Sequence, residues 1–250
     1  MFSLSFQIKL QRSSSSSKFI GPKDHLSGSW NVHDDESDID FSEYCVGTTV
    51  GECQVQEMRR VPINETTITC FDCKLKHRQT HFMTIRAWNK AGLFNLATTQ
   101  GITADLTPPS SGHVVPDNLF LPCVNRCTLA ATFDGFKDEE SGIKHCEFVV
   151  QNTNGPKMTP VIQTIGGNRA VASDVQLQHN EMYQIVVTCI NNLGETSIEA
   201  YSSPVTIDNN PPEKVSSSFY SSFLTQTQKV FLSPCGREIN PQLYDLAGLE

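Results

Sequence analysis

Residues 183–194 read YQIVVTCINNLG, and residues 81–93 read HFMTIRAWNKAGL, which is the same pattern about one hundred residues earlier. In both stretches apolar residues occupy alternate positions before an Asn and a Gly. Alternate residues of a β-strand point to the same face, so each stretch predicts a strand with one side turned to a core. The inward positions are Met83, Ile85, Ala87, Ile185, Val187 and Cys189.

Two further landmarks recur in the same order and at nearly the same spacing. Ser37 in DDESDI corresponds to Ser141 in DEESGI, and the proline pair at 108–109 corresponds to the pair at 211–212. A period of about 100 residues is too long for a solenoid and is the size of one β-sandwich domain. Short runs rich in Val, Ile, Thr and aromatic residues between Gly, Pro, Asn and Asp clusters also predict an all-β fold.

The segment Trp30–Ile39, WNVHDDESDI, is followed by Tyr44–Thr48, and Phe133–Ile143 repeats its pattern as FDGFKDEESGI. These motifs, with the strand pattern at 81–93 and 183–194, resemble divergent fibronectin type III-like repeats of large animal extracellular proteins. The resemblance implies tandem immunoglobulin-like β-sandwiches. It also implies a tyrosine corner, a hydrogen bond between a tyrosine hydroxyl and nearby backbone, at Tyr183. Repeat one carries His81 there instead.

The chain therefore divides into four expected parts. Residues 1–20, which include a serine run, are expected to form a low-complexity, disordered tail. Residues 21–110 form repeat one and residues 111–213 form repeat two. Residues 214–250 form a partial third repeat or a linker.

Nine cysteines favour an oxidising compartment. Cys45 and Cys53 flank a hairpin-like turn, and the outward parity of Cys45 predicts a disulfide at the surface. Cys146 and Cys189 have inward parity on neighbouring strands, and either a bridge or two small buried hydrophobic residues fits them. Cys235 is left over. The disulfide candidates are Cys45, Cys53, Cys70, Cys73, Cys123, Cys127, Cys146 and Cys189, and their connectivity stays open.

Two metal hypotheses compete with simpler interpretations. Cys70, Cys73, His77 and His81 offer four zinc ligands, but their spacing is shorter than in common zinc modules, and structural cysteines are favoured. The acidic loops at 34–40 and 138–140 lack the alternating spacing of a calcium loop. They are interpreted as solvated turns whose Asp and Ser side chains bind local backbone.

No catalytic motif is recognisable: the sequence contains no nucleophile elbow, P-loop or metalloprotease helix. We therefore expect no enzymatic activity and no cofactor. A net charge of −8 disfavours nucleic-acid partners. Asn64 opens an N-glycosylation sequon. Arg86 and Trp88 form a candidate contact patch, against which stands ordinary Trp–Arg stacking across the sheet.

The resemblance implies a non-catalytic structural or recognition module of a secreted or membrane-anchored protein that acts in cell adhesion or as a receptor ectodomain. Its partner would be another protein, and any membrane anchor would lie outside these 250 residues. Two alternatives remain at this point. One is an accessory region of a large extracellular enzyme, and the other is a calcium-dependent, cadherin-like adhesion module.

Overall fold

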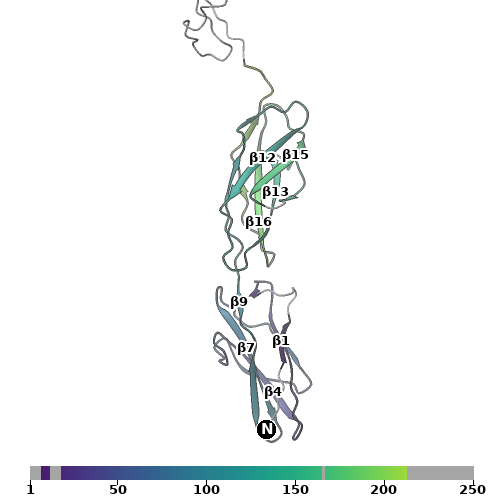
Figure 1. Cartoon of the computed structure of the whole chain (residues 1–250), viewed down its shortest axis with the longest axis vertical. Helices are drawn as coiled ribbons and strands as arrows, with labels where there is room; N and C mark the ends of the chain where they lie inside the picture. The colour runs from purple at the N-terminus through teal and green to yellow at the C-terminus, as the bar shows by residue number, and fades with distance from the viewer. Residues whose placement is uncertain (1–6, 12–17, 165–166, 213–250) are drawn as a thin grey trace, which may run out of the picture. The chain divides into compact units, whose positions relative to one another are not determined.

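The computed structural model describes residues 7–11, 18–164 and 167–212, and these form strands and loops without a helix (Figure 1). The strands of repeat one are β1 Gln7–Gln11, β2 Phe19–Ile20, β3 Leu26–Asn31, β4 Ile39–Gly47, β5 Gln56–Val61, β6 Thr67–Cys70, β7 Thr80–Asn89, β8 Phe94–Thr98 and β9 Ile102–Ala104. Those of repeat two are β10 His113–Pro116, β11 Phe120–Leu121, β12 Cys127–Asp134, β13 Ile143–Asn152, β14 Ile162–Gln163, β15 Arg169–Val175, β16 Met182–Asn191, β17 Ala200–Tyr201 and β18 Val205–Ile207.

Both repeats have the same sheet topology. One sheet has the order β1-β3-β6 in repeat one and β10-β12-β15 in repeat two. The other has the order β2-β9-β7-β4-β5 in repeat one, with β8 beside β7, and β11-β18-β16-β13-β14 in repeat two, with β17 beside β16. Even the unusual parallel pair at the edge, β2 with β9, recurs as β11 with β18. The all-β, tandem-sandwich architecture expected from the sequence is confirmed.

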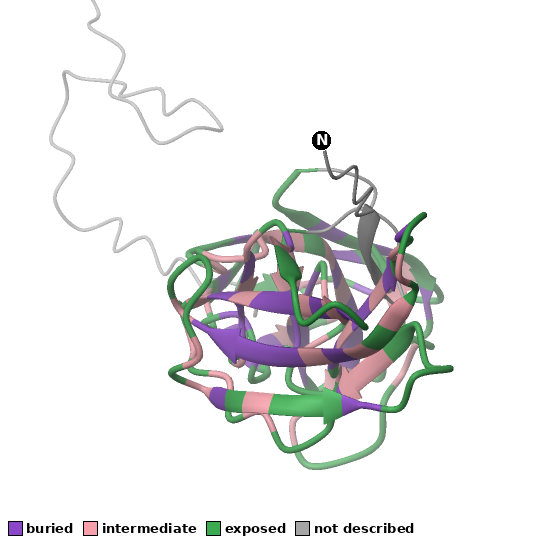
Figure 2. Cartoon of the chain, turned by 90° about the horizontal axis from the view of Figure 1, so that it is seen from below, coloured by how far each residue is buried: buried purple, intermediate pink, exposed green. Residues whose placement is uncertain are grey.

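Each sandwich has its own core between its two sheets. Trp30 and Tyr44 pack with Met83 and Ile85 in repeat one. The corresponding cluster of repeat two includes Phe133, Phe148, Tyr183 and Ile185. Figure 2 shows buried residues along several strands, whereas exposed residues occur at the turns and along parts of other strands.

The inward parity predicted for the two long strands is confirmed. All six predicted inward positions of β7 and β16 are at most 1% exposed. Each strand sits inside its sheet and so faces the opposite sheet along most of its length. Among the described residues, no helix has the length and apolar character needed to cross a bilayer.

The structure differs from the expected tail at residues 1–20. Gln7–Gln11 form β1, which pairs antiparallel with β3 from Gln7↔Asn31 to Gln11↔Ser27, and Phe19–Ile20 pair with β9. The physical reason is that β3 would otherwise present an unpaired edge, which β10 covers for β12 in repeat two. The serine run at 13–17 and the expected third repeat at 214–250 lie outside the described residues.

Candidate functional site

The structure joins eight of the nine cysteines into four disulfides. Three of them close short loops of eight, three and four residues, and the fourth spans 43 residues and links β13 to β16. The pairs are Cys45–Cys53, Cys70–Cys73, Cys123–Cys127 and Cys146–Cys189. Cys235 lies outside the described residues.

The expected surface position of the first bridge is wrong for Cys45, which is completely buried. The chain after β4 folds back over this residue: Cys45 Sγ lies 3.7 Å from the Glu52 carbonyl oxygen. Gly47 permits the turn, since a Cβ atom there would lie 2.0 Å from that same oxygen. Strand parity placed Cys45 on the outward face, but a loop covers that face.

The four residues of the zinc hypothesis do not converge. Cys70 and Cys73 are bonded to each other. His77 Nδ1 accepts a hydrogen bond from the Leu106 amide at 3.2 Å, and His81 Nε2 accepts one from the Lys76 amide at 3.4 Å. Each candidate ligand thus has a partner other than a shared metal ion.

In repeat one, His81 occupies the position of the corner tyrosine. In repeat two the Gln178 amide donates to the Tyr183 hydroxyl at 3.0 Å, five residues back along the chain. His81 Nε2 accepts a hydrogen bond from the Lys76 amide, which is also five residues back along the chain. Its side chain is fully buried, its Nδ1 atom has no partner, and this burial lowers its pKa.

Because His81 stands where repeat two has Tyr183, we predict that the stability of repeat one depends on pH in a way that repeat two does not share. Because the pKa of His81 is lower in the folded state, the unfolded chain binds more protons below about pH 6.5. The contribution of His81 to the stability of repeat one is therefore complete above about pH 6.5 and is lost as the pH falls through the pKa of the folded state. We expect His81→Tyr to weaken the loss of melting temperature of repeat one between pH 7.5 and pH 5.5. The reciprocal change Tyr183→His should introduce such a loss in repeat two; pH profiles that neither change alters would contradict this assignment.

A hydrogen-bond network, here called the Asp–Ser–Asn lock, closes one end of each sandwich. In repeat one, Asp34 Oδ1 accepts the amide of Ser37 at 2.8 Å and its hydroxyl at 3.2 Å. Asp34 Oδ2 accepts the side-chain amide of Asn89 at 3.0 Å, and Asn89 Oδ1 accepts the amide of Leu93 at 2.9 Å. These bonds, led by that from the Ser37 amide, lower the pKa of Asp34 to about 2.

Repeat two contains the same lock. Asp138 Oδ1 accepts the amide and the hydroxyl of Ser141 at 2.8 and 3.2 Å, and Asp138 Oδ2 accepts the side chain of Asn191 at 3.0 Å. Asn191 Oδ1 in turn accepts the amides of Leu193 and Glu195 at 3.0 and 2.8 Å. The lock explains why Asp, Ser and Asn recur at matched positions. Sequence reasoning recognised the landmarks but not that they bind one another.

Arg86 and Trp88 belong to a stack of rings and guanidinium groups on the outer face of the β5-β4-β7-β8 sheet. The Trp88 ring lies 5.9 Å from that of Phe41 and 4.7 Å from that of Phe94. Arg60 covers the Phe41 ring at 3.8 Å, and Arg86 lies 5.0 Å from the Phe94 centroid. Trp88 Nε1 also donates to Glu43 at 3.0 Å. Arg86 and Trp88 are thus packed within the sheet face.

The exposed part of this face comes from β8, which sequence reasoning did not single out. Phe94 is 50% exposed and Leu96 is 47% exposed. They share a face because they are two residues apart in a strand paired with β7 through Trp88↔Phe94 and Arg86↔Leu96. The alternation of Phe94 and Leu96 beside Trp88 was a usable signal, but it required the register of β7 and β8. We call Trp88, Phe94 and Leu96 the β8 face.

No family model matches the chain, and no curated protein sequence matches it. Among solved structures, a bacterial ice-binding adhesin has a TM-score of 0.51 at 13% identity, with 83% of this chain and 65% of the other covered. The two antiparallel sheets and their shared strand order give each repeat a fibronectin type III-like fold. Domains of titin have a TM-score of 0.46 at 15% identity, with 83% of this chain and 68% of the other covered. Fibronectin(III)-like modules of Clostridium thermocellum CbhA have a TM-score of 0.40 at 9% identity, with 81% of this chain and 94% of the other covered.

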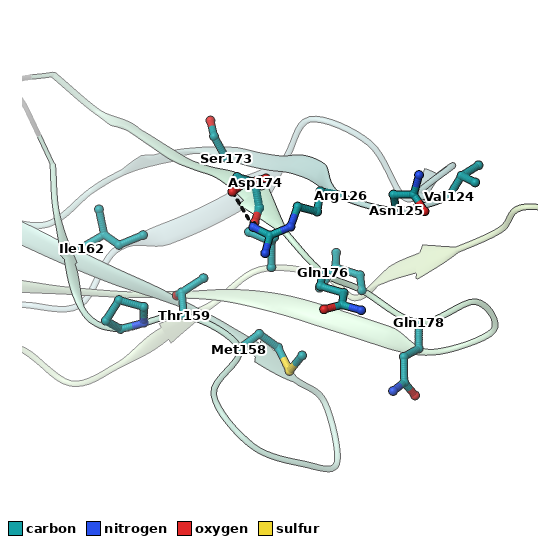
Figure 3. A pocket seen from close by; sticks show the side chains of 13 residues that line it. Val124, Asn125, Arg126, Met158, Thr159, Ile162, Ser173, Asp174, Gln176 and Gln178 are labelled. Atoms are coloured by element: carbon teal, nitrogen blue, oxygen red, sulfur yellow. Dashed lines mark hydrogen bonds and ion pairs between the residues drawn. The ribbon is translucent and has the colours of Figure 1, made fainter.

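The second fibronectin type III-like repeat has a pocket of about 950 Å³ beside the Cys123–Cys127 loop (Figure 3). Arg126, its most prominent charged side chain, is paired with Asp174. The remaining lining is a mixture of polar and aliphatic side chains such as Thr159, Met158 and Gln176. Among the described residues that line this pocket, no acid–base pair and no nucleophile with a base is present.

Proposed function

We propose that the chain is a non-catalytic binding segment of an extracellular protein and that it binds a protein partner through the β8 face. The supporting observation is the pair of exposed apolar side chains, Phe94 and Leu96, held on a rigid stack of aromatic and arginine side chains. Aromatic residues and arginine dominate the binding energy of protein interfaces, and a prepacked face loses little entropy on binding.

The charge of the stack favours a partner with an acidic surface. Arg60 and Arg86 lie among the rings, and in the described part of the chain Glu43 is the one carboxylate with a contact to the stack. This local excess of positive charge contrasts with the net charge of −8 of the whole chain. A complementary acidic patch would favour docking at this face rather than elsewhere on the acidic chain.

The extracellular location is supported by the disulfides, since bridges persist in oxidising compartments and are rare in the cytosol. Asn64 of the glycosylation sequon is exposed in the loop between β5 and β6, where a glycan could be attached without disturbing the core. We expect the secreted protein to shift to lower mass on enzymatic deglycosylation, and Asn64→Gln to remove that shift. An unchanged mass would contradict glycosylation at this residue.

The proposal is tested by binding of the oxidised chain, tetramerised and fluorescently labelled, to intact cells. We expect saturable binding that is lost when the cells are treated with trypsin. Replacing Phe94 and Leu96 together by alanine should weaken binding at least about tenfold, because two exposed apolar anchors are removed. Circular dichroism and melting temperature check that the variant remains folded.

Repeat two offers a matched control. Ile198 occupies the position of Leu96 in the second fibronectin type III-like repeat and is 77% exposed, but Thr196 stands there in place of Phe94. Ile198→Ala should leave binding unchanged. Equal losses for the two variants, or binding that survives the double substitution on β8, would contradict the assignment of the site.

A further inference from the structure

Three carboxylate side chains from two distant segments of the chain lie close together. Asp105 directly follows β9 at the end of repeat one, whereas Asp138 and Glu140 lie in the loop between β12 and β13 of repeat two. One oxygen atom of each lies within 4.8 Å of the others. Three like charges this close repel one another unless a cation lies among them.

Asp105 is the residue that points to a missing ligand. It is fully buried, and its Oδ2 atom has no hydrogen-bond partner. Its other oxygen accepts only a long hydrogen bond, from the Thr107 amide at 3.4 Å. A buried carboxylate with an unpartnered oxygen is costly, and a bound cation would compensate it.

The basic groups nearby leave the Oδ2 atom of Asp105 without a partner. Arg78 pairs with Glu139 at 2.6 Å and with Glu140, but no ion pair joins it to Asp105 among the described residues. His77 lies 3.9 Å from Asp105 and 4.0 Å from Glu140. Because His77 Nδ1 accepts the Leu106 amide, its proton is assigned to Nε2, and neither nitrogen is available to a metal ion.

We propose that Asp105, Asp138 and Glu140 bind a calcium ion. The available ligands are all carboxylate oxygens, which calcium and magnesium prefer, while zinc would require nitrogen or sulfur. Calcium accepts irregular geometry and fills its remaining positions with water or carbonyl oxygens, which suits ligands from two separate segments. Asp138 keeps its place in the lock through Ser141 and Asn191 and so presents its carboxylate in a fixed position. The site is independent of the β8 face.

The proposal predicts one calcium site with a Kd of about 0.1–1 mM, the range of extracellular calcium modules. Isothermal titration of the intact, oxidised, EDTA-treated chain with calcium chloride measures it. Asp105→Asn, which keeps the shape of the side chain and removes its charge, should weaken binding at least about tenfold. Glu140→Gln, at a more accessible position, should also weaken binding and guards against a folding defect of the Asp105 variant. Calcium should raise the melting temperature of the unaltered chain and not that of these variants.

Repeat one provides the control. Glu36 occupies the position of Glu140 in the corresponding loop and is exposed. Glu36→Gln should leave the calcium affinity unchanged. Absence of calcium binding up to 10 mM, a rough upper bound for extracellular sites, would overturn the proposal. So would equal weakening by Glu36→Gln, because it would indicate general attraction to acidic loops.

Discussion

Replacing Cys146 and Cys189 together by alanine is expected to lower the free energy of unfolding of repeat two by about 4 kcal/mol. Their disulfide closes a segment of 43 residues and joins directly opposed positions of β13 and β16, two central strands of the sheet. Such a bridge stabilises mainly by restricting the unfolded chain, and the restriction grows with loop length. Denaturation by guanidinium chloride measures the change.

The matched control is removal of the Cys45–Cys53 bridge, which closes only eight residues. Its loss should destabilise repeat one by about 2.5 kcal/mol. The order of the two effects is the critical result. A larger effect from the short bridge would show that its buried contacts near Glu52, and not loop length, determine the stability.

Asn191→Ala is expected to destabilise repeat two by about 3 kcal/mol. Asn191 is fully buried, donates to Asp138, and accepts the amides of Leu193 and Glu195. Alanine would leave these partners without a hydrogen bond at a closely packed end of the sandwich. The measurement is the midpoint of chemical denaturation followed by circular dichroism.

An exposed asparagine in the same repeat serves as the control. Asn154 lies in the turn after β13, and Asn154→Ala should change the stability by less than about 0.5 kcal/mol. Asn89→Ala, at the matching position of repeat one, should reproduce the large effect. A loss below about 1 kcal/mol for both lock variants would show that the Asp–Ser–Asn lock is not a main source of stability.

Much of the fold could be predicted because strand periodicity is local. The alternation of Met83, Ile85 and Ala87 determines the inward face of β7 without knowledge of any other strand. The recurrence of Ser141 and Asn191 about one hundred residues after Ser37 and Asn89 indicated two copies of one domain. These signals depend only on spacing along the chain.

The remaining features depend on contacts between distant segments. The burial of Cys45 follows from a returning loop, and the strand at Gln7–Gln11 follows from the need to pair β3. The meeting of Asp105 with Glu140 joins the end of one repeat to a loop of the next. Strand periodicity gives no information about such long-range contacts, because neither segment alone determines where the other lies.

If the chain folds as an oxidised pair of fibronectin type III-like sandwiches, its cysteines are linked as in the structure. Peptide mapping without reduction, on protein taken from its native cells with thiols blocked at lysis, tests this linkage most directly. We predict linked peptides for Cys45–Cys53, Cys70–Cys73, Cys123–Cys127 and Cys146–Cys189. Blocked, unlinked thiols at Cys146 and Cys189 in the native protein would contradict both the extracellular assignment and the cross-link between the central strands of repeat two.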